Sequence, residues 1–368
     1  MIIRCSKNDL VNGINIVSKA VPAKTTMPIL ECILIDAAGQ KINLIGNDME
    51  LGIETSIAGE IEEKGTIAID ADILSGIIRK LPEEAVEIRT EGEKVTITCN
   101  KSKFVILGKD GREFVYLPEI DKNDGINVSQ FTLRDIINKT IFSISDNDSN
   151  KMMTGELMEI SNGMLRVVSL DGHRISIRKS ELNGSYNDRR VIIPGKTLNE
   201  ISKILDGDTD KFVSIFFTDK HVLFEFNETT VVTRLIEGEY FRIDQMISSD
   251  YETHFTVNRK ELLDCVDRAT LLVREGDKKP IIMTIADASI QLRINTAIGS
   301  MDESIEVNKS GKDLMIGFNP KFLIDALRAI DDEEVDMYFV NSKAPCFIRD
   351  AEESYNYVVL PVNFAAAE

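Results

Sequence analysis

Residues 10–21, LVNGINIVSKAV, set the pattern that decides the fold. The apolar side chains of Leu10, Ile14, Val17 and Val21 are spaced by 4, 3 and 4 residues, which is the stripe of an amphipathic helix. The stripe returns 127 and 252 residues further along the chain. The later copies are Ile137, Ile141 and Ile144, and then Leu262, Val266, Ala269 and Val273. The chain therefore contains three copies of one unit.

A second helical stripe follows the first in each copy. Its members are Leu74, Ile77 and Leu81, then Leu198, Ile201 and Leu205, then Leu323, Leu327 and Ile330. Short alternating runs typical of antiparallel strands surround each of these helices. We therefore expect three similar α+β domains, at residues 1–122, 127–247 and 250–368. Repeated units of this kind commonly build arcs or rings.

The charge of the chain is unevenly distributed. The formal net charge is −18, which argues against an ordinary nucleic-acid binder. Helices are predicted at 7–24, 72–81, 132–151, 196–206, 258–279 and 321–331. These six stretches together carry +4, so the rest of the chain carries −22. The pattern fits a plain solvated acidic surface, or an acidic exterior around locally basic helices.

Composition limits the cellular setting and the chemistry. Five cysteines without CxxC spacing are typical of reduced thiols in the cytoplasm, and they favour neither a disulfide framework nor a zinc site. The first residues lack the apolar core of a signal peptide, and no stretch is long enough to cross a membrane. We expect a cytoplasmic protein with no membrane partner, no cofactor and no metal.

One cluster could suggest an enzyme. Ser169, Asp171 and His173 lie close together in the sequence, but neighbouring residues in a turn seldom aim at one reacting atom. Asp171-Gly172 favours a turn that leaves His173 and Arg174 exposed, either for recognition or to lock the turn. The chain has no GxxxxGK[ST] loop, no GxGxxG after a strand and no GxSxG elbow. An enzyme using the turn from Asp171 to His173 stays as an alternative to a binding protein.

Four short motifs occur in the order in which a known family carries them. They are Thr26-Met27-Pro28-Ile29-Leu30, Asp171-Gly172-His173-Arg174, Gly317-Phe318-Asn319 and Tyr357-Val358-Val359-Leu360-Pro361. They are similar to the T-x-P-I-L segment, the D-G-H-R turn, the G-F-N segment and the Y-V-x-x-P strand of that family. Together with the threefold repeat, they make the chain resemble the bacterial DNA sliding clamps, the beta subunits of DNA polymerase III, over essentially its whole length.

The resemblance implies a non-catalytic processivity clamp, a head-to-tail homodimer that closes a ring around duplex DNA. Six similar helices in each chain make twelve in a dimer, enough to line a central hole with the sheets outside. A ring holds DNA by topology, so it needs few phosphate contacts, and salt screens the outer acids. The candidate DNA contacts are Lys24, Arg79, Lys80, Lys139, Lys151, Lys196, Lys203, Arg259, Arg268, Lys278, Lys279, Lys321 and Arg328. Each of them could instead belong to a plain solvated helix face.

Head-to-tail closure requires two different, complementary edges. The resemblance places one edge at Lys101, Lys103, Phe104 and Ile106. It places the other at Leu271 and Leu272, with the acidic partners Asp302, Glu303 and Glu306. Phe104 and Ile106 alternate on a predicted strand, which suits an exposed apolar row, although an ordinary core face would show the same alternation.

The resemblance also implies a groove that receives short linear peptides of partner proteins. Its walls map to Met153, Leu170, Gly172, His173, Arg174, Ile175, Phe241, Met246, Asn319, Phe322, Ala344, Pro345, Val358, Leu360 and Val362. Two departures affect its shape: Phe241 stands where the family commonly has proline, and the chain continues past Val362. We expect Phe241 to cap the empty groove and to swing aside on binding, the alternative being that it packs under the Tyr240 turn.

The implied partners are those of a replication clamp in the bacterial cytoplasm, at the nucleoid. They are duplex DNA, a second copy of the chain, the replicative polymerase catalytic subunit, the clamp loader, repair and translesion polymerases, ligase and mismatch-repair proteins. Beside the enzyme, one further alternative stays open, a repeat scaffold that binds protein peptides and has no role on DNA.

Overall fold

The computed structural model describes residues 1–147, 149–273 and 279–364. In each repeat a strand runs directly into a helix. β1 (Ile2–Ser6) leads into α1 (Lys7–Val17), β11 (Gly125–Ser129) into α3 (Gln130–Asn138), and β19 (Thr253–Asn258) into α5 (Arg259–Thr270). The hydroxyl of Ser6 accepts a hydrogen bond from the Asp9 amide at 3.0 Å, and the Asn258 side chain accepts one from the Glu261 amide at 3.0 Å. These N-caps satisfy amides that would otherwise lack partners, so they fix where the helices begin.

The second helix of each repeat begins in the same way. β6 (Thr66–Asp70) leads into α2 (Ala71–Lys80), β15 (Arg189–Pro194) into α4 (Gly195–Ile204), and β24 (Leu314–Phe318) into α6 (Pro320–Arg328). Asp70 caps α2 through its bond from the Ile73 amide at 2.9 Å. Asn319 caps α6, where Pro320 occupies a first-turn position that needs no amide donor. The predicted alternation of strand and helix is confirmed.

Three of the predicted helices are too long. α1 gives way to a 3₁₀ turn at Ser18–Ala20, α5 ends at Thr270, and α3 ends at Asn138. Beyond α3 the described residues of the predicted stretch form only the separate 3₁₀ turns Ile141–Ser143 and Lys151–Thr154. The Thr140 hydroxyl donates to the Ile136 carbonyl at 2.8 Å, and such bonds compete with the helical ladder. The apolar spacing continues because a 3₁₀ turn also aligns residues three apart.

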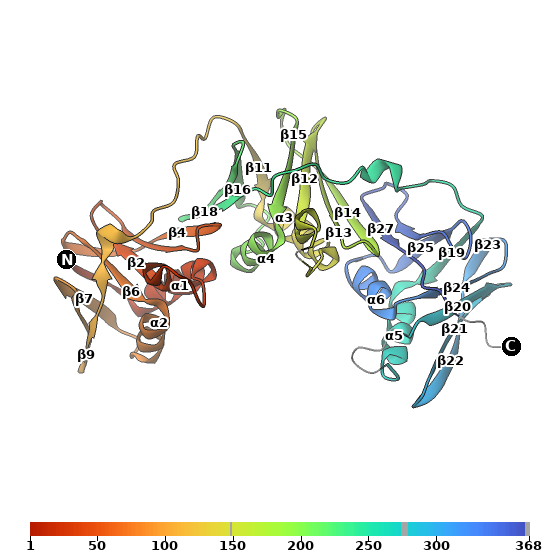
Figure 1. Ribbon diagram of the computed structural model, residues 1–368, viewed down its shortest axis with the longest axis horizontal. Coiled ribbons are helices and arrows are strands. Elements are labelled where there is room, and N and C mark those ends of the chain that lie inside the picture. The colour runs from red at the N-terminus through yellow and green to blue at the C-terminus, as the bar shows by residue number, and fades with distance from the viewer. Residues whose placement is uncertain (148, 274–278, 365–368) are drawn as a thin grey trace. The chain divides into compact units, whose positions relative to one another are not determined.

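The chain divides into two compact units, of which unit 1 comprises residues 1–131 and 200–235. Within its described residues it contains two antiparallel sheets (Figure 1). The nine-stranded sheet has the order β10 (Lys109–Asp110), β6, β2 (Cys32–Asp36), β3 (Ile42–Asn47), β4 (Leu51–Ile57), β18 (Thr229–Arg234), β17 (His221–Phe226), β16 (Phe212–Phe217), β11. The five-stranded sheet has the order β5 (Gly59–Glu63), β1, β7 (Ala85–Glu91), β8 (Lys94–Cys99), β9 (Ser102–Leu107).

Unit 2, residues 132–199 and 236 onward, is built in the same way where the structure describes it. Its nine-stranded sheet has the order β15, β12 (Gly155–Ser161), β13 (Met164–Leu170), β14 (Arg174–Glu181), β27 (Tyr355–Val359), β26 (Cys346–Arg349), β25 (Glu334–Phe339), β19, β23 (Asn308–Gly311). Its four-stranded sheet has the order β22 (Gly299–Glu306), β21 (Ser289–Thr296), β20 (Ile281–Ala286), β24.

Each nine-stranded sheet contains strands of two successive repeats. In unit 1, β4 pairs with β18 and Ile53 lies opposite Val231. In unit 2, β14 pairs with β27 and Ile175 lies opposite Val358 (Figure 1). The central repeat therefore shares a sheet with the repeat before it and with the repeat after it. The compact units follow these sheets, whereas the domain limits predicted from the sequence follow the repeats.

The helices bury the stripes from which they were predicted. Leu10 and Leu74 are fully buried where α1 packs on α2. Leu262 and Leu327 are fully buried where α5 packs on α6, and Figure 1 shows these two helices side by side. Each such leucine contributes about 1.5–3 kcal/mol by leaving water. No helix in the described part of the chain is long and apolar enough to span a bilayer.

Candidate functional site

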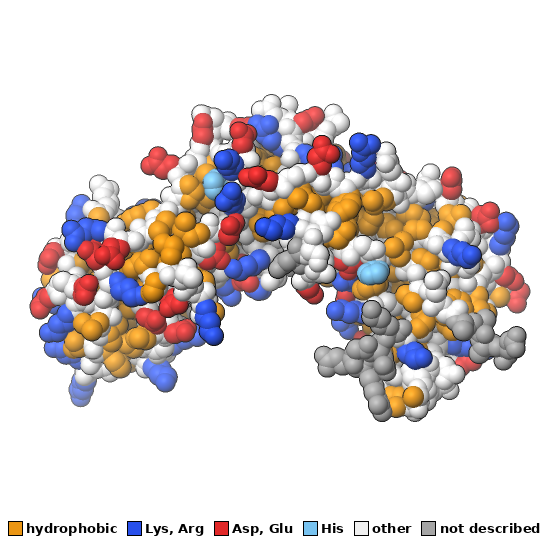
Figure 2. Space-filling view, viewed as in Figure 1, with side chains coloured by type: hydrophobic (Ala, Val, Ile, Leu, Met, Phe, Trp, Pro, Cys, Tyr) orange, Lys and Arg blue, Asp and Glu red, His pale blue; other side chains and the backbone are white. Residues whose placement is uncertain are grey.

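A hydrophobic cavity of about 340 Å³ opens on unit 2, within the size range of ligand pockets. It is lined by Met153, Leu170, Gly172, Arg174, Ile175, Phe241, Met246, Pro345, Val358 and Leu360, all of which are predicted groove residues. They come from the 3₁₀ turn Lys151–Thr154, from the ends of β13 and β14, from the segment 236–249, from the residue before β26, and from β27 and the residues after it. Figure 2 shows hydrophobic side chains gathered where β14 and β27 lie in Figure 1. Pairing of β14 with β27 brings the two halves of this site together.

The other predicted groove residues lie outside this cavity; they are His173, Asn319, Phe322, Ala344 and Val362. The His173 ring stacks on the Phe322 ring, with centroids 6.1 Å apart. The His173 carbonyl accepts a hydrogen bond from the Leu360 amide at 2.9 Å, and the Val362 amide donates to the Gly317 carbonyl at 2.8 Å. These contacts place His173 beside the cavity and attach the C-terminal segment to the end of β24.

The expectation that the turn leaves Arg174 exposed is wrong, although Arg174 lines the cavity as predicted. Its guanidinium is buried and donates to Asp171 at 2.9 Å, to Asp325 at 2.6 Å and to the Phe142 carbonyl. The Asp171 carboxylate also accepts from the backbone amides of His173 and Arg174, and Gly172 supplies the positive φ of 87° that the turn requires. Arg174 therefore locks the turn.

The same geometry argues against the enzyme alternative. The Ser169 hydroxyl is buried and donates to the Thr140 carbonyl at 2.5 Å. Asp171 is engaged by Arg174, and the His173 ring lies on Phe322. A serine nucleophile requires a base within hydrogen-bond reach, and these three side chains point to different partners.

Phe241 lines the cavity and also packs beside Tyr240. Its ring meets the Tyr240 ring edge-on, with centroids 5.8 Å apart. The Tyr240 hydroxyl donates to the Val168 carbonyl at 3.3 Å, and burial raises the pKa of this phenol well above its usual value. The packing alternative therefore describes the observed contact, while the motion expected of Phe241 on binding stays a prediction.

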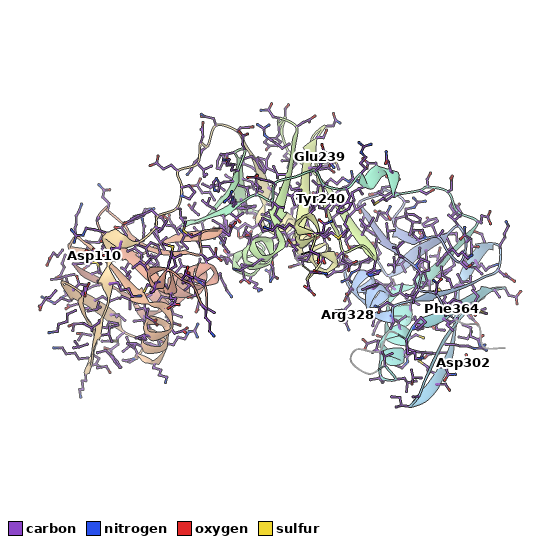
Figure 3. The ribbon with its side chains drawn as sticks, viewed as in Figure 1. Asp110, Glu239, Tyr240, Asp302, Arg328 and Phe364 are labelled. Carbon is purple, nitrogen blue, oxygen red and sulfur yellow. The ribbon has the colours of Figure 1, made fainter. Side chains whose placement is uncertain are left out.

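The predicted DNA contacts lie mainly on helices. Those on α2, α4, α5 and α6 are Arg79, Lys80, Lys196, Lys203, Arg259, Arg268, Lys321 and Arg328. Lys24, Lys151 and Lys279 are exposed but lie outside the α-helices, and Lys278 lies outside the described residues. Arg328, at the end of α6 in Figure 3, pairs with Asp267 at 3.1 Å. Arg268 pairs with Glu303.

Lys139 is the least available of these candidates. It follows the last residue of α3 and is mostly buried. Its ammonium pairs with Asp135 at 2.6 Å and also with Asp331. Because two carboxylates compensate this charge within the chain, Lys139 adds little to the attraction of a phosphate.

The two predicted subunit edges are outer strands of their sheets. On β9 the side chains of Phe104, Val105 and Leu107 are 39%, 53% and 79% exposed, so the core-face alternative is wrong for Phe104. Val105 and Leu107 were missed because alternation assigns only one exposed face to a strand, whereas this one exposes side chains on both faces. On the other edge, β22 carries Asp302, which is labelled in Figure 3. Its carboxylate pairs with Arg293 at 2.8 Å.

The two leucines predicted for the second edge differ in their surroundings. Leu271 directly follows α5 and is 79% exposed. Leu272 is only half-buried and packs against the core of the C-terminal repeat. Leu271 is therefore the more exposed of the two leucines and lies outside that core.

Comparisons with known proteins agree with this arrangement. Family models of the DNA polymerase III beta subunit match residues 1–118 as its N-terminal domain, 127–241 as its central domain and 244–363 as its C-terminal domain. The beta sliding clamp of Bacillus subtilis (strain 168) is 34% identical over 373 residues, covering 97% of this chain and 98% of the relative. A putative DNA polymerase III beta subunit from Eubacterium rectale ATCC 33656 has a crystal structure that superposes with a TM-score of 0.97 at 62% identity, covering 99% of each chain. The crystal structure of the Bacillus subtilis sliding clamp gives 0.96 at 32% identity, covering 99% of this chain and 100% of that one.

Three α+β repeats joined through shared sheets, with β9 and β22 as outer strands of the two smaller sheets, agree with the clamp fold of these relatives. The chain belongs to the DNA polymerase III beta-subunit family, the bacterial beta sliding clamps. This membership confirms the predicted fold class and the predicted function, that of a non-catalytic accessory subunit in DNA replication. It does not favour the enzyme or the scaffold without DNA.

Proposed function

We propose that two copies of this chain close head to tail into a ring that encircles duplex DNA and holds the replicative polymerase on it. The proposal rests on a comparison of two kinds of strand: the outer strands β9 and β22, and the strands that join successive repeats within the chain. β4 and β14 occupy the same place in their repeats as β22, and β18 and β27 the same place as β9. The first two pairs are joined, β4 to β18 and β14 to β27. Pairing β22 of one copy with β9 of the other extends the same rule around a closed ring.

Side-chain chemistry supports this pairing. β9 and the turn before it carry Lys101 and Lys103 beside the exposed apolar side chains. β22 carries Asp302, Glu303 and Glu306. Opposite charges select the partner edge, and the apolar side chains supply the buried area. Each chain already contains two nine-stranded sheets, so pairing the four-stranded sheet of one copy with the five-stranded sheet of the other at both interfaces would give the dimer a fifth and a sixth.

In such a ring we assign the exposed basic residues of the helices to the DNA. Their role is electrostatic and independent of sequence, because lysine and arginine contact phosphates without reading bases. The net charge of −18 argues against tight binding by attraction alone, so we expect retention on DNA to depend on closure of the ring. The three repeats, 1–122, 127–247 and 250–368, are proposed as the clamp domains.

We assign the cavity on unit 2 to short linear peptides of the Gln-Leu-x-Leu-Phe type. Its apolar walls accept a leucine or phenylalanine anchor, and Met153 and Met246 can adapt to different sequences. The proposed ligands are peptides of the polymerase catalytic subunit, the clamp loader, repair and translesion polymerases, ligase and mismatch-repair proteins. The proposed location is the nucleoid in the bacterial cytoplasm.

Release from linear DNA tests the ring. The protein is loaded onto a nicked circular duplex, isolated, and challenged with salt that removes ordinary DNA binders. We expect it to remain on the circle and to leave within minutes once a restriction enzyme linearises the DNA. Equal loss from circular and linear DNA would contradict the ring, because binding would then depend on charge alone.

A further inference from the structure

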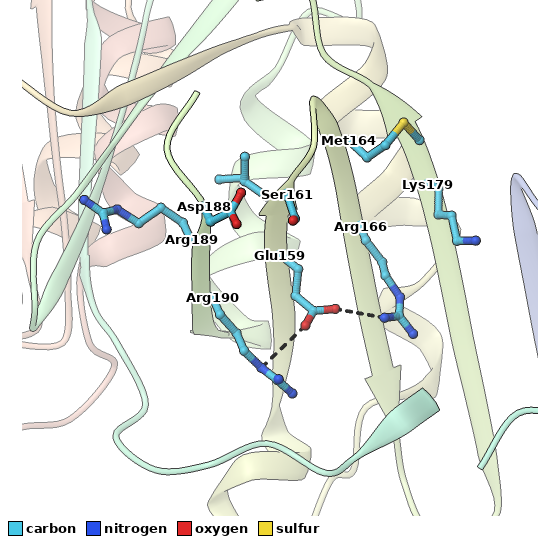
Figure 4. Close-up of a pocket in the computed structure, with 9 residues that line it drawn as sticks. Glu159, Ser161, Met164, Arg166, Lys179, Asp188, Arg189 and Arg190 are labelled. Carbon is cyan, nitrogen blue, oxygen red and sulfur yellow. Dashed lines mark hydrogen bonds and ion pairs between the residues drawn. The ribbon is translucent and has the colours of Figure 1, made fainter. Parts of the chain in front are cut away.

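Two positive side chains lie directly opposite each other on the nine-stranded sheet of unit 2. In the pairing of β13 with β14, Arg166 lies opposite Lys179. Like charges in this position destabilise a sheet, so the pair requires compensation. Figure 4 shows Arg166 and Lys179 on neighbouring strands, with Glu159 between Arg166 and Arg190, while Arg189 extends away from them.

Of the three carboxylates that compensate the charges of Arg166 and Lys179, two lie outside the strands of the sheet. Arg166 pairs with Glu159 of β12 at 3.1 Å and with Asp244 of the segment 236–249 at 3.0 Å. Lys179 pairs with Glu353, from the turn before β27, at 3.3 Å. The side chains of Asp244 and Glu353 are 84% and 64% exposed. Ion pairs with such exposed partners are weak, so the carboxylate of a ligand can replace them.

The pair forms the shared wall of two hollows. A hollow of about 500 Å³ is lined by Arg166 and Lys179 together with Arg190, and one of about 300 Å³ by the same two residues together with Arg349. Arg190 makes one ion pair among the described residues, from Nε to Glu159 at 3.5 Å. The larger hollow sets four basic side chains, Arg166, Lys179, Arg189 and Arg190, against the carboxylates of Glu159 and Asp188, so its lining is net positive in a chain of net charge −18 and attracts an acidic segment.

The site is continuous with the hydrophobic groove. Ile175 lines the groove, Ile177 packs in the same apolar cluster, and Lys179 lines the hollow. Because these residues alternate along β14, their side chains share one face of the sheet. From Ile175 to Lys179 the strand advances about 13 Å, a distance that about four extended residues of a bound peptide can span.

We propose that the Arg166–Lys179 pair is a second subsite for partner peptides, which accepts an acidic side chain about four residues away from the groove-binding motif. The proposal rests on the peptide groove proposed above. Arg166 pairs with Asp244 in the segment that carries Phe241 and Met246, whereas Lys179 and Arg190 extend the charge toward solvent. A partner would thus be selected by its flanking acids as well as by its apolar anchors.

The test uses the full-length protein and three forms of one groove peptide, measured by calorimetry in low salt. The first peptide is the motif alone. The second adds a four-residue Gly-Ser spacer followed by two glutamates, and it is made in two versions, with the addition before or after the motif. The third is the same as the second, with two glutamines in place of the two glutamates. We expect the glutamates to raise the affinity about threefold to tenfold over the glutamines, and added salt to remove the gain. Lys179→Gln and the double variant Lys179→Gln/Arg190→Gln should abolish the gain, whereas Lys220→Gln, the same charge change at an exposed site in unit 1, should keep it.

Other results would contradict the proposal, and they separate a failure of the second subsite from a failure of the groove. If the motif binds but the glutamates add nothing at either end, or if the gain persists in the double variant, the second subsite is wrong and the groove stands. If the motif alone does not bind the parent protein, the groove is wrong and the subsite falls with it. If a single-stranded oligonucleotide binds the parent and loses its binding in Lys179→Gln while the peptides do not, the pair is a phosphate site and the proposal is overturned.

Discussion

The Arg174 guanidinium donates from Nη1 to Oδ2 of Asp325 at 2.6 Å. Arg174 begins β14 in the central repeat, and Asp325 lies on α6 in the C-terminal repeat. The same guanidinium lies over the Phe322 ring, 4.5 Å from its centroid. One buried cation thus connects the turn beside the groove to the helix behind it.

We expect Arg174→Gln to destabilise unit 2 by about 3–5 kcal/mol, because it leaves Asp171 and Asp325 without their shared cation. Thermal unfolding followed by circular dichroism measures the effect. The matched control is Arg112→Gln, which removes an exposed ion pair with Asp110 and should change stability by less than about 1 kcal/mol. Equal melting of Arg174→Gln and the control would show that the network contributes nothing.

Glu156 on β12 should make stability depend on pH. It is fully buried, and neither carboxylate oxygen has a hydrogen-bond partner among the described residues. Burial raises its pKa from 4.5 to about 8, against a smaller opposite effect of Thr140. The folded protein therefore holds this proton more tightly than the unfolded chain, so the stabilisation is complete below about pH 4.5 and is lost as the pH rises through about 8.

Glu156→Gln should remove this dependence, since the amide is close in shape to the protonated acid. We expect parent and variant to melt alike near pH 5 and the variant to melt at the higher temperature at pH 9. Each unit of pKa shift corresponds to about 1.4 kcal/mol. Melting temperatures across this range measure the difference, with Glu181→Gln as a control at an exposed position. A parent and variant that lose stability equally toward pH 9 would mean that Glu156 is ionised without penalty.

Met246→Ala and Leu360→Ala should each weaken binding of the groove peptide by about 1–3 kcal/mol. Both side chains line the cavity and are partly exposed, so their loss should leave the fold and the dimer unchanged. Calorimetry measures the affinity. Met315→Ala is the matched control, because Met315 has similar exposure but lies outside the cavity. If the control weakens binding as much as Met246→Ala, the peptide binds elsewhere.

Leu107→Ala and Leu271→Ala should each weaken the dimer by roughly 2 kcal/mol or more, because both leucines are 79% exposed in the single chain and become buried on pairing. Sedimentation should then find folded monomers at concentrations where the parent is dimeric. Leu272→Ala should also lower the melting temperature, since Leu272 packs against the core. Ile73→Ala, at an exposed isoleucine of α2, serves as the control and should leave the dimer intact. Unchanged dimers in both leucine variants would exclude the proposed edges.

Much of the groove could be predicted from the sequence because ordered motifs carry a resemblance to one family, and that resemblance places further groove residues outside the motifs. Met153, Leu170, Ile175 and Val358 line one cavity although they come from different segments. The burial of Arg174 could not be predicted, since the turn motif is compatible with an exposed or a buried guanidinium. The guanidinium is buried because it pairs with Asp325, which is 151 residues away in the sequence.

The sequence by itself determined the threefold repeat and the alternation of strands and helices. Hydrophobic periodicity and capping residues act over a few neighbouring positions, so stripes such as Leu10 to Val17 carry that information locally. Only the tertiary structure decided that β9 exposes both faces, that α3 stops at Asn138, and that Arg166 lies opposite Lys179. These features depend on strand order, register and contacts between distant segments, and a sheet chooses its pairing by the packing of whole faces rather than by any short stretch of residues.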